Sequence, residues 1–270
     1  MSVAAVSSSH LDQLEAEAIT VLREAWVGLK PLVMLWSLGK DSNVVLWLTR
    51  KAFFGHVPWP LALLDTGKEL PEVYAFRDRM VAEWRLDCLA VDCPPDSATD
   101  PTLPPKARAA ARKTLGLQQL IAERELNGVI LGIRRDEQAV RGKERVFSLR
   151  TADGAWDPTA QALDLWGFVP PPPSGGHVRV HPLLDWSELD VWRYIRREGV
   201  PIPDLYFARN GLRYRSLGEA DITHPIASTA ADIDAVIAEL EATRTPERAG
   251  RSMDRETEDA FERLRRAGYM

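Results

Sequence analysis

The sequence predicts an α/β fold, namely a doubly wound, mainly parallel sheet of five strands flanked by helices. Its short apolar runs, such as LVMLWS at 32–37, are apolar throughout, which is typical of strands buried on both faces. Segments whose apolar residues recur at helical spacing alternate with these runs. The resulting βαβαβ order favours a parallel sheet, because parallel neighbours need a long crossover connection, usually a helix.

The expected elements follow in order, without an internal repeat. The first is a helix over 10–29 that carries an apolar stripe and ends near Gly28. Strands are expected at 32–37, 61–65, 87–93, 128–132 and 178–182. Helices are expected between them at about 41–53, 70–85 and 107–125. A helix over 186–199 follows the last strand, with Ser187 as its N-cap and Gly199 just past its end.

The chain is expected to divide into a main domain, residues 1–200, and a small C-terminal helical extension, residues 201–270. The extension carries two apolar-periodic segments, at 229–243 and 254–267, that predict two helices. GFVPPPPSGG at 167–176 is too rich in proline and glycine for regular structure, so we expect an exposed connection there.

Composition and charge exclude several functional classes. The net charge of −5 argues against sequence-independent binding of nucleic acid, which needs a dominant basic surface. There is no run of ~18 apolar residues and no signal-peptide pattern, so we expect a soluble protein with no membrane segment. Cys88 and Cys93 lie five apart on an expected strand and point to opposite faces, so they cannot pair there. With no CxxC or Cys/His cluster, a reducing cytoplasm fits best.

SLGKDS, residues 37–42, predicts a phosphate site. A strand ends there, a short loop with Gly39 follows, and a helix begins, so backbone N–H groups face outward at the positive end of the helix dipole. Lys40 adds a point charge, and Ser37 and Ser42 add hydroxyl donors. The spacing is not that of a Walker A loop. The alternative is an ordinary strand–helix turn.

LDTG at 64–67 closes the second expected strand, next to the first strand's loop. Ligands of doubly wound sheets bind at this edge, so Asp65 and Thr66 are candidates to face a nucleotide. A polar cap on a strand end is the alternative interpretation.

A basic segment follows the fourth expected strand. Its cations are Arg134, Arg135, Arg141, Lys143, Arg145 and Arg150. Charge runs usually form solvated surfaces, but this run lies at the same sheet edge as the phosphate loop. Guanidinium groups match tetrahedral oxyanions with two hydrogen bonds, which favours arginines as ligands here. Asp136 and Glu137 are candidates to orient these arginines or to hold magnesium.

These motifs resemble those of one family. SLGKDS is similar to the SGGKDS-type loop of the PP-loop ATP pyrophosphatase and adenylyl sulfate reductase superfamily. Further motifs in the same order are LDTGKELPEVYAFRD (64–78), IRRDEQAVRGKERVFSLR (133–150), WDP (156–158), RVHPLLDWSELDVWRYI (179–195) and ERAGR (247–251). Together they resemble the small, nucleotide-binding subunit of bacterial heterodimeric sulfate adenylyltransferases, from about residue 10 to the terminal GYM.

The resemblance implies an adenine nucleotide α-hydrolase-like fold and transfer of AMP from ATP to sulfate, with Mg²⁺. It implies catalytic roles for Lys40, Arg134, Arg135 and Arg145. The implied nucleotide ligands are Ser37, Gly39, Lys40, Asp41, Ser42, Asp65, Thr66 and Gly67. The implied substrate ligands are Arg141, Lys143, Arg150, Arg248 and Arg251, and the implied magnesium ligands are Asp41 and Asp136. A GTPase large subunit is the implied partner, and a homo-oligomer is a further expectation.

Competing interpretations remain at this point. An adenylyl sulfate reductase needs a nucleophilic cysteine, usually near the C-terminus, but the last cysteine here is Cys93. A tRNA-thiolating enzyme would need a basic surface and paired cysteines. A nucleotide sensor without catalysis is a third possibility. The segments 205–218 and GEADITHP (218–225) depart from the family pattern, which leaves an adenylyltransferase for another oxyanion, or one in a specialised sulfur pathway, as the main alternative.

Overall fold

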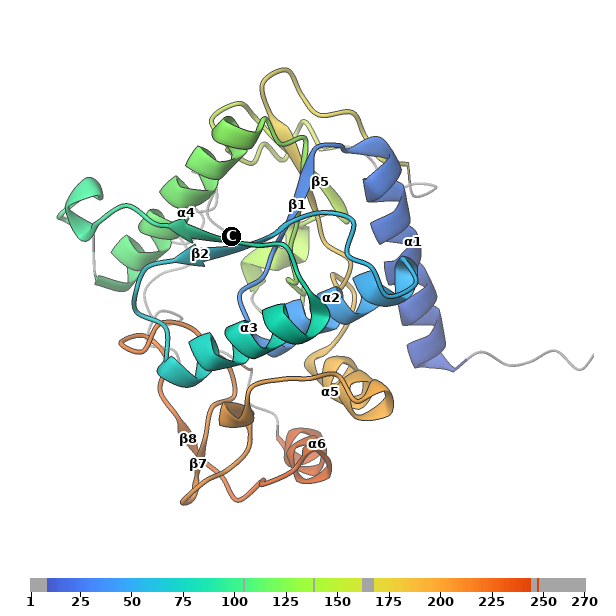
Figure 1. Cartoon of the computed structure of the whole chain (residues 1–270), viewed down its shortest axis with the longest axis vertical. Helices are drawn as coiled ribbons and strands as arrows, with labels where there is room; N and C mark the ends of the chain where they lie inside the picture. The colour runs from blue at the N-terminus through green and yellow to red at the C-terminus, as the bar shows by residue number, and fades with distance from the viewer. Residues whose placement is uncertain (1–8, 104, 138, 162–167, 244–246, 248–270) are drawn as a thin grey trace, which may run out of the picture.

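The computed structural model describes residues 9–103, 105–137, 139–161, 168–243 and 247. A six-stranded sheet forms its centre, in the order β3-β2-β1-β4-β6-β5 (Figure 1). The strands are β1 Leu32–Leu35, β2 Leu61–Asp65, β3 Cys88–Asp92, β4 Gly128–Ile130, β5 Phe147–Arg150 and β6 His177–Val180. The first four and β6 are the five predicted strands, and their pairings are all parallel.

The prediction of five strands was one short, because β5 pairs antiparallel with β6 at the edge of the sheet. This strand lies in the basic segment, where we expected no strand. Its Ser148 and Arg150 are buried against Glu144, to which both donate hydrogen bonds. These polar side chains made the segment resemble an exposed one in the sequence, although it forms a buried strand.

Helices cover both faces of the sheet (Figure 1). The helices are α1 His10–Gly28, α2 Lys40–Ala52, α3 Pro71–Trp84, α4 Pro105–Arg124, α5 Glu188–Glu198 and α6 Ile233–Ala242. Met34 and Leu63 belong to a core cluster with α1, α2, α3 and α5, whereas Leu35 and Leu64 pack with α4. Successive strand residues point to opposite faces, so the apolar runs fill two cores. The doubly wound class is confirmed.

The helix α5 begins and ends where its sequence predicts. The Ser187 hydroxyl accepts a hydrogen bond from the Asp190 N–H at 3.1 Å, and the Asp190 carboxylate accepts one from the Ser187 N–H at 2.9 Å. Gly199 adopts the left-handed conformation, with φ of 66°, that ends the helix.

Beyond α5 the chain forms a short hairpin and one further described helix. Strands β7 Leu212–Arg213 and β8 Ile226–Ala227 pair antiparallel, and α6 packs on α5. The 3₁₀ turns within the described residues are η1 Asp96–Ala98, η2 Ala139–Lys143 and η3 Asp204–Tyr206. The predicted helix at 229–243 is confirmed as α6, while the one at 254–267 lies outside the described residues. No helix in the described ranges is long and apolar enough to span a membrane.

Candidate active site

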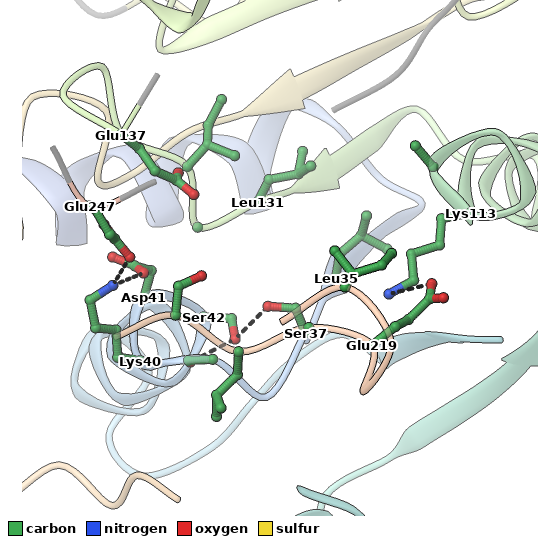
Figure 2. Close-up of a pocket in the computed structure, with 18 of the residues that line it drawn as sticks. Leu35, Ser37, Lys40, Asp41, Ser42, Lys113, Leu131, Glu137, Glu219 and Glu247 are labelled. Atoms are coloured by element: carbon green, nitrogen blue, oxygen red, sulfur yellow. Dashed lines mark hydrogen bonds and ion pairs between the residues drawn. The ribbon is translucent and has the colours of Figure 1, made fainter. Parts of the chain in front are cut away.

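A cavity opens at the carboxyl ends of β1 and β4, where the strand order changes direction. The chain passes from β1 to β2 on one side, and β4 lies on the other side of β1, so this is the position where doubly wound folds bind ligands. Figure 2 shows the cavity and the side chains around it. Its lining includes the predicted residues Ser37, Gly39, Lys40, Asp41, Ser42 and Arg141.

The loop between β1 and α2 is tightly held. Leu38 is fully buried and adopts a left-handed backbone with φ of 63°, which is costly for a residue with a side chain. Asn43 secures the loop, because its Nδ2 donates to the Leu38 carbonyl at 3.1 Å and its Oδ1 accepts from the Trp36 indole at 2.7 Å. Gly39 then caps α2, whose first residue is Lys40.

Tyr206 connects this loop to the C-terminal part of the chain. Its buried hydroxyl accepts a hydrogen bond from the Lys40 N–H at 2.8 Å, and its ring packs edge-on against Trp192. Burial, together with the Asp41 carboxylate, raises the pKa of the Tyr206 hydroxyl well above its ordinary value. The phenol is therefore neutral at physiological pH and available as a hydrogen-bond donor.

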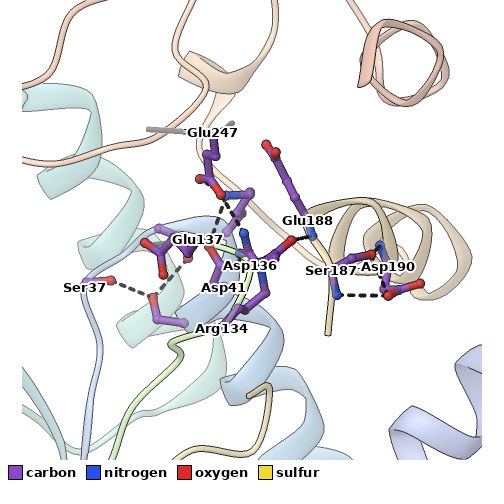
Figure 3. Close-up of polar contacts among 12 residues, drawn as sticks. Ser37, Asp41, Arg134, Asp136, Glu137, Ser187, Glu188, Asp190 and Glu247 are labelled. Carbon is purple, nitrogen blue, oxygen red and sulfur yellow. Dashed lines mark hydrogen bonds and ion pairs between the residues drawn. The ribbon is translucent and has the colours of Figure 1, made fainter. Parts of the chain in front are cut away.

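Two buried cations, Lys40 and Arg134, share the carboxylates of Asp41 and Glu247. Figure 3 shows Arg134 beside these two carboxylates. The Lys40 ammonium lies 3.1 Å from Asp41 and 2.5 Å from Glu247. The Arg134 guanidinium contacts Asp41, and it lies 2.9 Å from Asp136 and 2.6 Å from Glu247. Glu247 thus bridges both cations with one carboxylate.

The charges in this cluster hold one another in the ionised state. Burial alone would lower the pKa of Lys40, but the Asp41 and Glu247 carboxylates outweigh it and raise that pKa. Burial would raise the pKa of Glu247, but Lys40 and Arg134 lower it to about 2. Burial raises the pKa of nearby Glu188, and the charge of Glu247 adds to that shift. At neutral pH the two cations and Glu247 are therefore charged.

The predicted arginines lie in different places. Arg134 belongs to the cluster, and Arg141 lines the cavity, where it pairs with Glu137. Arg135 instead contacts Asp185 and donates to the Glu144 carbonyl at 3.0 Å. Asp136 and Glu137, the candidates to orient arginines, contact Arg134 and Arg141 respectively.

The remaining predicted cations are not among the residues that line the cavity in the described part of the chain. Arg150 lies on β5 and donates to Ser148 and Glu144, at 2.6 and 2.9 Å. Lys143 is exposed, and the carbonyl of Arg145 lies 2.7 Å from Nδ1 of His181. Arg248 and Arg251 lie outside the described residues.

Asp65, Thr66 and Gly67 sit at the carboxyl end of β2, as predicted, but they are not part of the cavity lining described here. The Asp65 carboxylate accepts from the Gly67 N–H at 2.7 Å and from the Tyr74 hydroxyl at 2.6 Å. Gly67 has φ of 74°, which suits glycine. In this arrangement Asp65 stabilises the turn that follows β2.

The two predicted magnesium ligands carry cation or backbone contacts. Asp41 contacts Lys40 and Arg134, and Asp136 accepts from Arg134 and from the Glu188 N–H at 2.7 Å. Across the described ranges, no cluster of three or more His, Cys, Asp or Glu could hold a metal by protein ligands alone. A magnesium ion here would need ligands from a bound substrate, as is usual for nucleotide sites.

Comparison with known proteins identifies the family. The family model of the phosphoadenosine phosphosulfate reductase domain matches residues 31–225. Sulfate adenylyltransferase subunit 2 of Rhizobium meliloti is 39% identical, over 96% of this chain and 93% of that protein. The protein of the same name from Pseudomonas aeruginosa is 38% identical, over 97% and 98%. The chain belongs to the sulfate adenylyltransferase subunit 2 family.

Several solved structures share the fold of this chain, although their sequence identity to it is low. The Candida glabrata FMN adenylyltransferase in complex with ATP has a TM-score of 0.56 at 18% identity, over 83% of this chain and 67% of that one. A phosphoadenylyl-sulfate reductase from Candida auris has a TM-score of 0.50 at 18% identity, over 82% and 98%. These similarities support the adenine nucleotide α-hydrolase-like architecture.

The two cysteines of this chain distinguish it from a thiol-dependent reductase. Cys88 and Cys93 are both free, and burial raises the pKa of each thiol to about 11. Neither is therefore a thiolate at neutral pH, and no cysteine follows Cys93. The chain lacks the reactive cysteine that the reductase interpretation requires.

Sequence reasoning missed several residues of the cavity, among them Lys113, Tyr206, Glu219 and Glu247. Tyr206, Glu219 and Glu247 lie within segments that we had singled out, respectively 205–218, GEADITHP and ERAGR. The order of residues does not show which side chain of such a segment returns to a loop more than 150 residues earlier. A contact between distant segments depends on the complete fold.

Proposed function

We propose that the chain is a sulfate adenylyltransferase subunit that transfers AMP from ATP to sulfate and releases pyrophosphate. The observation that carries this function is the pair of buried cations, Lys40 and Arg134, beside the SLGKDS loop. The function named for its relatives needs such a site, because a triphosphate and a dianionic acceptor meet there.

The reaction needs charge neutralisation more than proton transfer. A sulfate oxygen attacks the α-phosphorus of ATP, a new S–O–P bond forms, and the bond to the β-phosphate breaks. Sulfate is already deprotonated at neutral pH, so no general base is required. Catalysis then consists of positioning the reactants in line and stabilising charge on the leaving pyrophosphate.

In the proposed complex, Lys40 and Arg134 hold phosphate oxygens, and a phosphate group takes the place of the Glu247 carboxylate. The N–H groups at the start of α2 add the positive end of a helix dipole. Arg141 lines the same cavity and is the nearest candidate for the sulfate. Asp41 and Asp136 would be the protein ligands of a magnesium ion, which would supply positive charge to the phosphates.

A partner subunit is part of the proposal. The name "subunit 2" of the relatives implies one, and the motifs resemble a family whose large subunit is a GTPase. The sulfate–phosphate anhydride is strongly uphill from ATP, so a second process must drive its accumulation. We propose that GTP hydrolysis by the partner supplies this drive, in the cytoplasm.

The test measures pyrophosphate release from ATP and Mg²⁺ by the purified chain, with and without its co-purified partner and GTP. Sulfate should support release, the partner and GTP should raise the yield of adenylyl sulfate, and chloride should give no release. Molybdate, a sulfate analogue whose product hydrolyses, should give continuous release. With the partner and GTP present, release with an oxyanion other than sulfate or its analogue molybdate, but none with sulfate, would contradict the proposed acceptor.

A further inference from the structure

The cavity continues from the cation cluster to a second polar pair, Lys113 and Glu219. Figure 2 shows this pair at the opposite end of the cavity from Lys40 and Glu247, with Ser37 between. The Glu219 carboxylate is 2% exposed, and its Oε1 lies 3.5 Å from the Lys113 ammonium. Its other oxygen, Oε2, is buried and has no hydrogen-bond partner among the described residues.

Lys113 cannot fully neutralise the charge of this carboxylate, because it also forms an ion pair with Glu69. The Lys113 ammonium lies 2.9 Å from Glu69, closer than to Glu219. Two carboxylates therefore share one cation at this end of the cavity. A buried carboxylate oxygen without a donor is costly, so the site favours a ligand that brings an N–H or O–H group.

The backbone around Glu219 is fixed against the end of β2. The Ala220 N–H donates to the Lys68 carbonyl at 2.8 Å, and the N–H groups of Ile222 and Thr223 donate to the Glu219 carbonyl, both at 2.9 Å. These bonds fix the backbone from which the Glu219 side chain extends. Residue 219 also lies in GEADITHP, a segment that departs from the resembled family pattern.

Apolar side chains also line the cavity, among them Leu35, Ala109, Ala110, Leu131 and Ile222. A nucleotide whose phosphates bind at Lys40 extends its ribose and then its base away from that residue. The group that reaches Glu219 is therefore the base, and apolar walls suit a planar ring better than a ribose. The 6-amino group of adenine supplies the missing donor.

We propose that Glu219 is the residue that selects adenine, by accepting a hydrogen bond from its 6-amino group at Oε2. This inference rests on the proposed use of ATP and adds the residue that recognises the base. A 6-oxo purine places a carbonyl oxygen there and is repelled by the carboxylate. Selection against such bases follows from an unpaired, buried acceptor.

The experiment measures equilibrium binding of ATP, purine riboside triphosphate, which lacks the 6-amino group, and 2′-deoxy-ATP to the full chain. The wild type should bind the des-amino analogue at least about tenfold more weakly than ATP. Glu219→Met, which keeps the length but removes the acceptor, should bind both equally. Glu219→Gln, which keeps an acceptor oxygen, should retain most of the difference.

Glu69→Gln is the matched control, because it removes a carboxylate from the same lysine but outside the described cavity lining. It should preserve the discrimination. The proposal is overturned if Glu219→Met, folded as judged by its thermal unfolding, still discriminates like the wild type. It is equally overturned if that variant loses discrimination against 2′-deoxy-ATP instead, because the contact is then with the ribose. A wild type that binds no ATP contradicts the proposed function as well.

Discussion

Lys40 is the residue on which the proposed chemistry depends most directly. Replacing it with alanine should reduce kcat/KM for adenylyl transfer by roughly 100-fold or more, on the order of 3 kcal/mol, because a charge on the leaving pyrophosphate loses its closest cation. Arg134 remains to pair with both Asp41 and Glu247, so the fold should persist.

Lys51→Ala is the control for this change. Lys51 lies on the same helix, pairs with Glu15 and Glu198 at 2.7 and 2.9 Å, and is one-third exposed, so its loss should leave activity nearly unchanged. Steady-state rates and thermal unfolding of both variants decide the matter. Full activity in a folded Lys40→Ala protein would contradict the proposal that the SLGKDS loop binds phosphate through Lys40.

At the scale of elements, Gly132 determines how closely β4 approaches the start of α2. A Cβ added there would lie 3.0 Å from the backbone carbon of Asp41 and from the backbone nitrogen of Ser42. Backbone atoms cannot move aside cheaply, so Gly132→Ala should displace the phosphate loop. We expect a loss of about 1–3 kcal/mol in stability, from overpacking, and a fall in activity.

Gly142→Ala is the matched substitution, because a Cβ there meets nothing within 4 Å. Urea unfolding and pyrophosphate release should show that this variant behaves as the wild type. If Gly132→Ala is as stable and active as Gly142→Ala, then the close packing of β4 on α2 does not control the site.

The elements themselves were largely predictable, because the signals that define them are local. Short segments rich in apolar residues, such as LVMLWS, marked the five parallel strands, and Ser187 and Gly199 marked the ends of α5. The strand β5 was not predicted, because its buried Ser148 and Arg150 are polar. They form hydrogen bonds with each other and with Glu144. Only the tertiary partner makes such a polar strand stable, and no short-range pattern shows that partner.

At the scale of the whole molecule, the site joins segments far apart in the sequence. The phosphate loop was predictable from one strand–helix junction. Its Lys40, however, contacts Tyr206, which lies 166 positions later, and Glu247, which lies 207 positions later. The cavity therefore draws on both the expected main domain and the expected C-terminal extension. Arginines were predictable as a group, yet packing decided that Arg141 lines the cavity while Arg150 supports the sheet.

The stability of the whole molecule should depend on pH through two buried histidines. Burial, helped by Arg179 and Arg150, lowers the pKa of His177 to about 3. Burial lowers the pKa of His181 to about 4. In the unfolded chain both take up protons near pH 6.5, whereas the folded chain does not, so stability should fall as the pH drops from 6.5 towards 4.

The expected loss between pH 7.5 and 5.5 is about 3 kcal/mol for the two histidines together, from the protons that only the unfolded chain binds. Urea unfolding at the two pH values measures it. His181→Asn removes one of the two groups and should halve the loss, while His56→Asn, at an exposed position, should leave it unchanged. Equal stability at both pH values would show that the histidines are accessible to protons in the folded state. Glu247, whose pKa is lowered, adds its own loss near and below its ordinary value of 4.5, so the loss between pH 7.5 and 5.5 reports on the histidines.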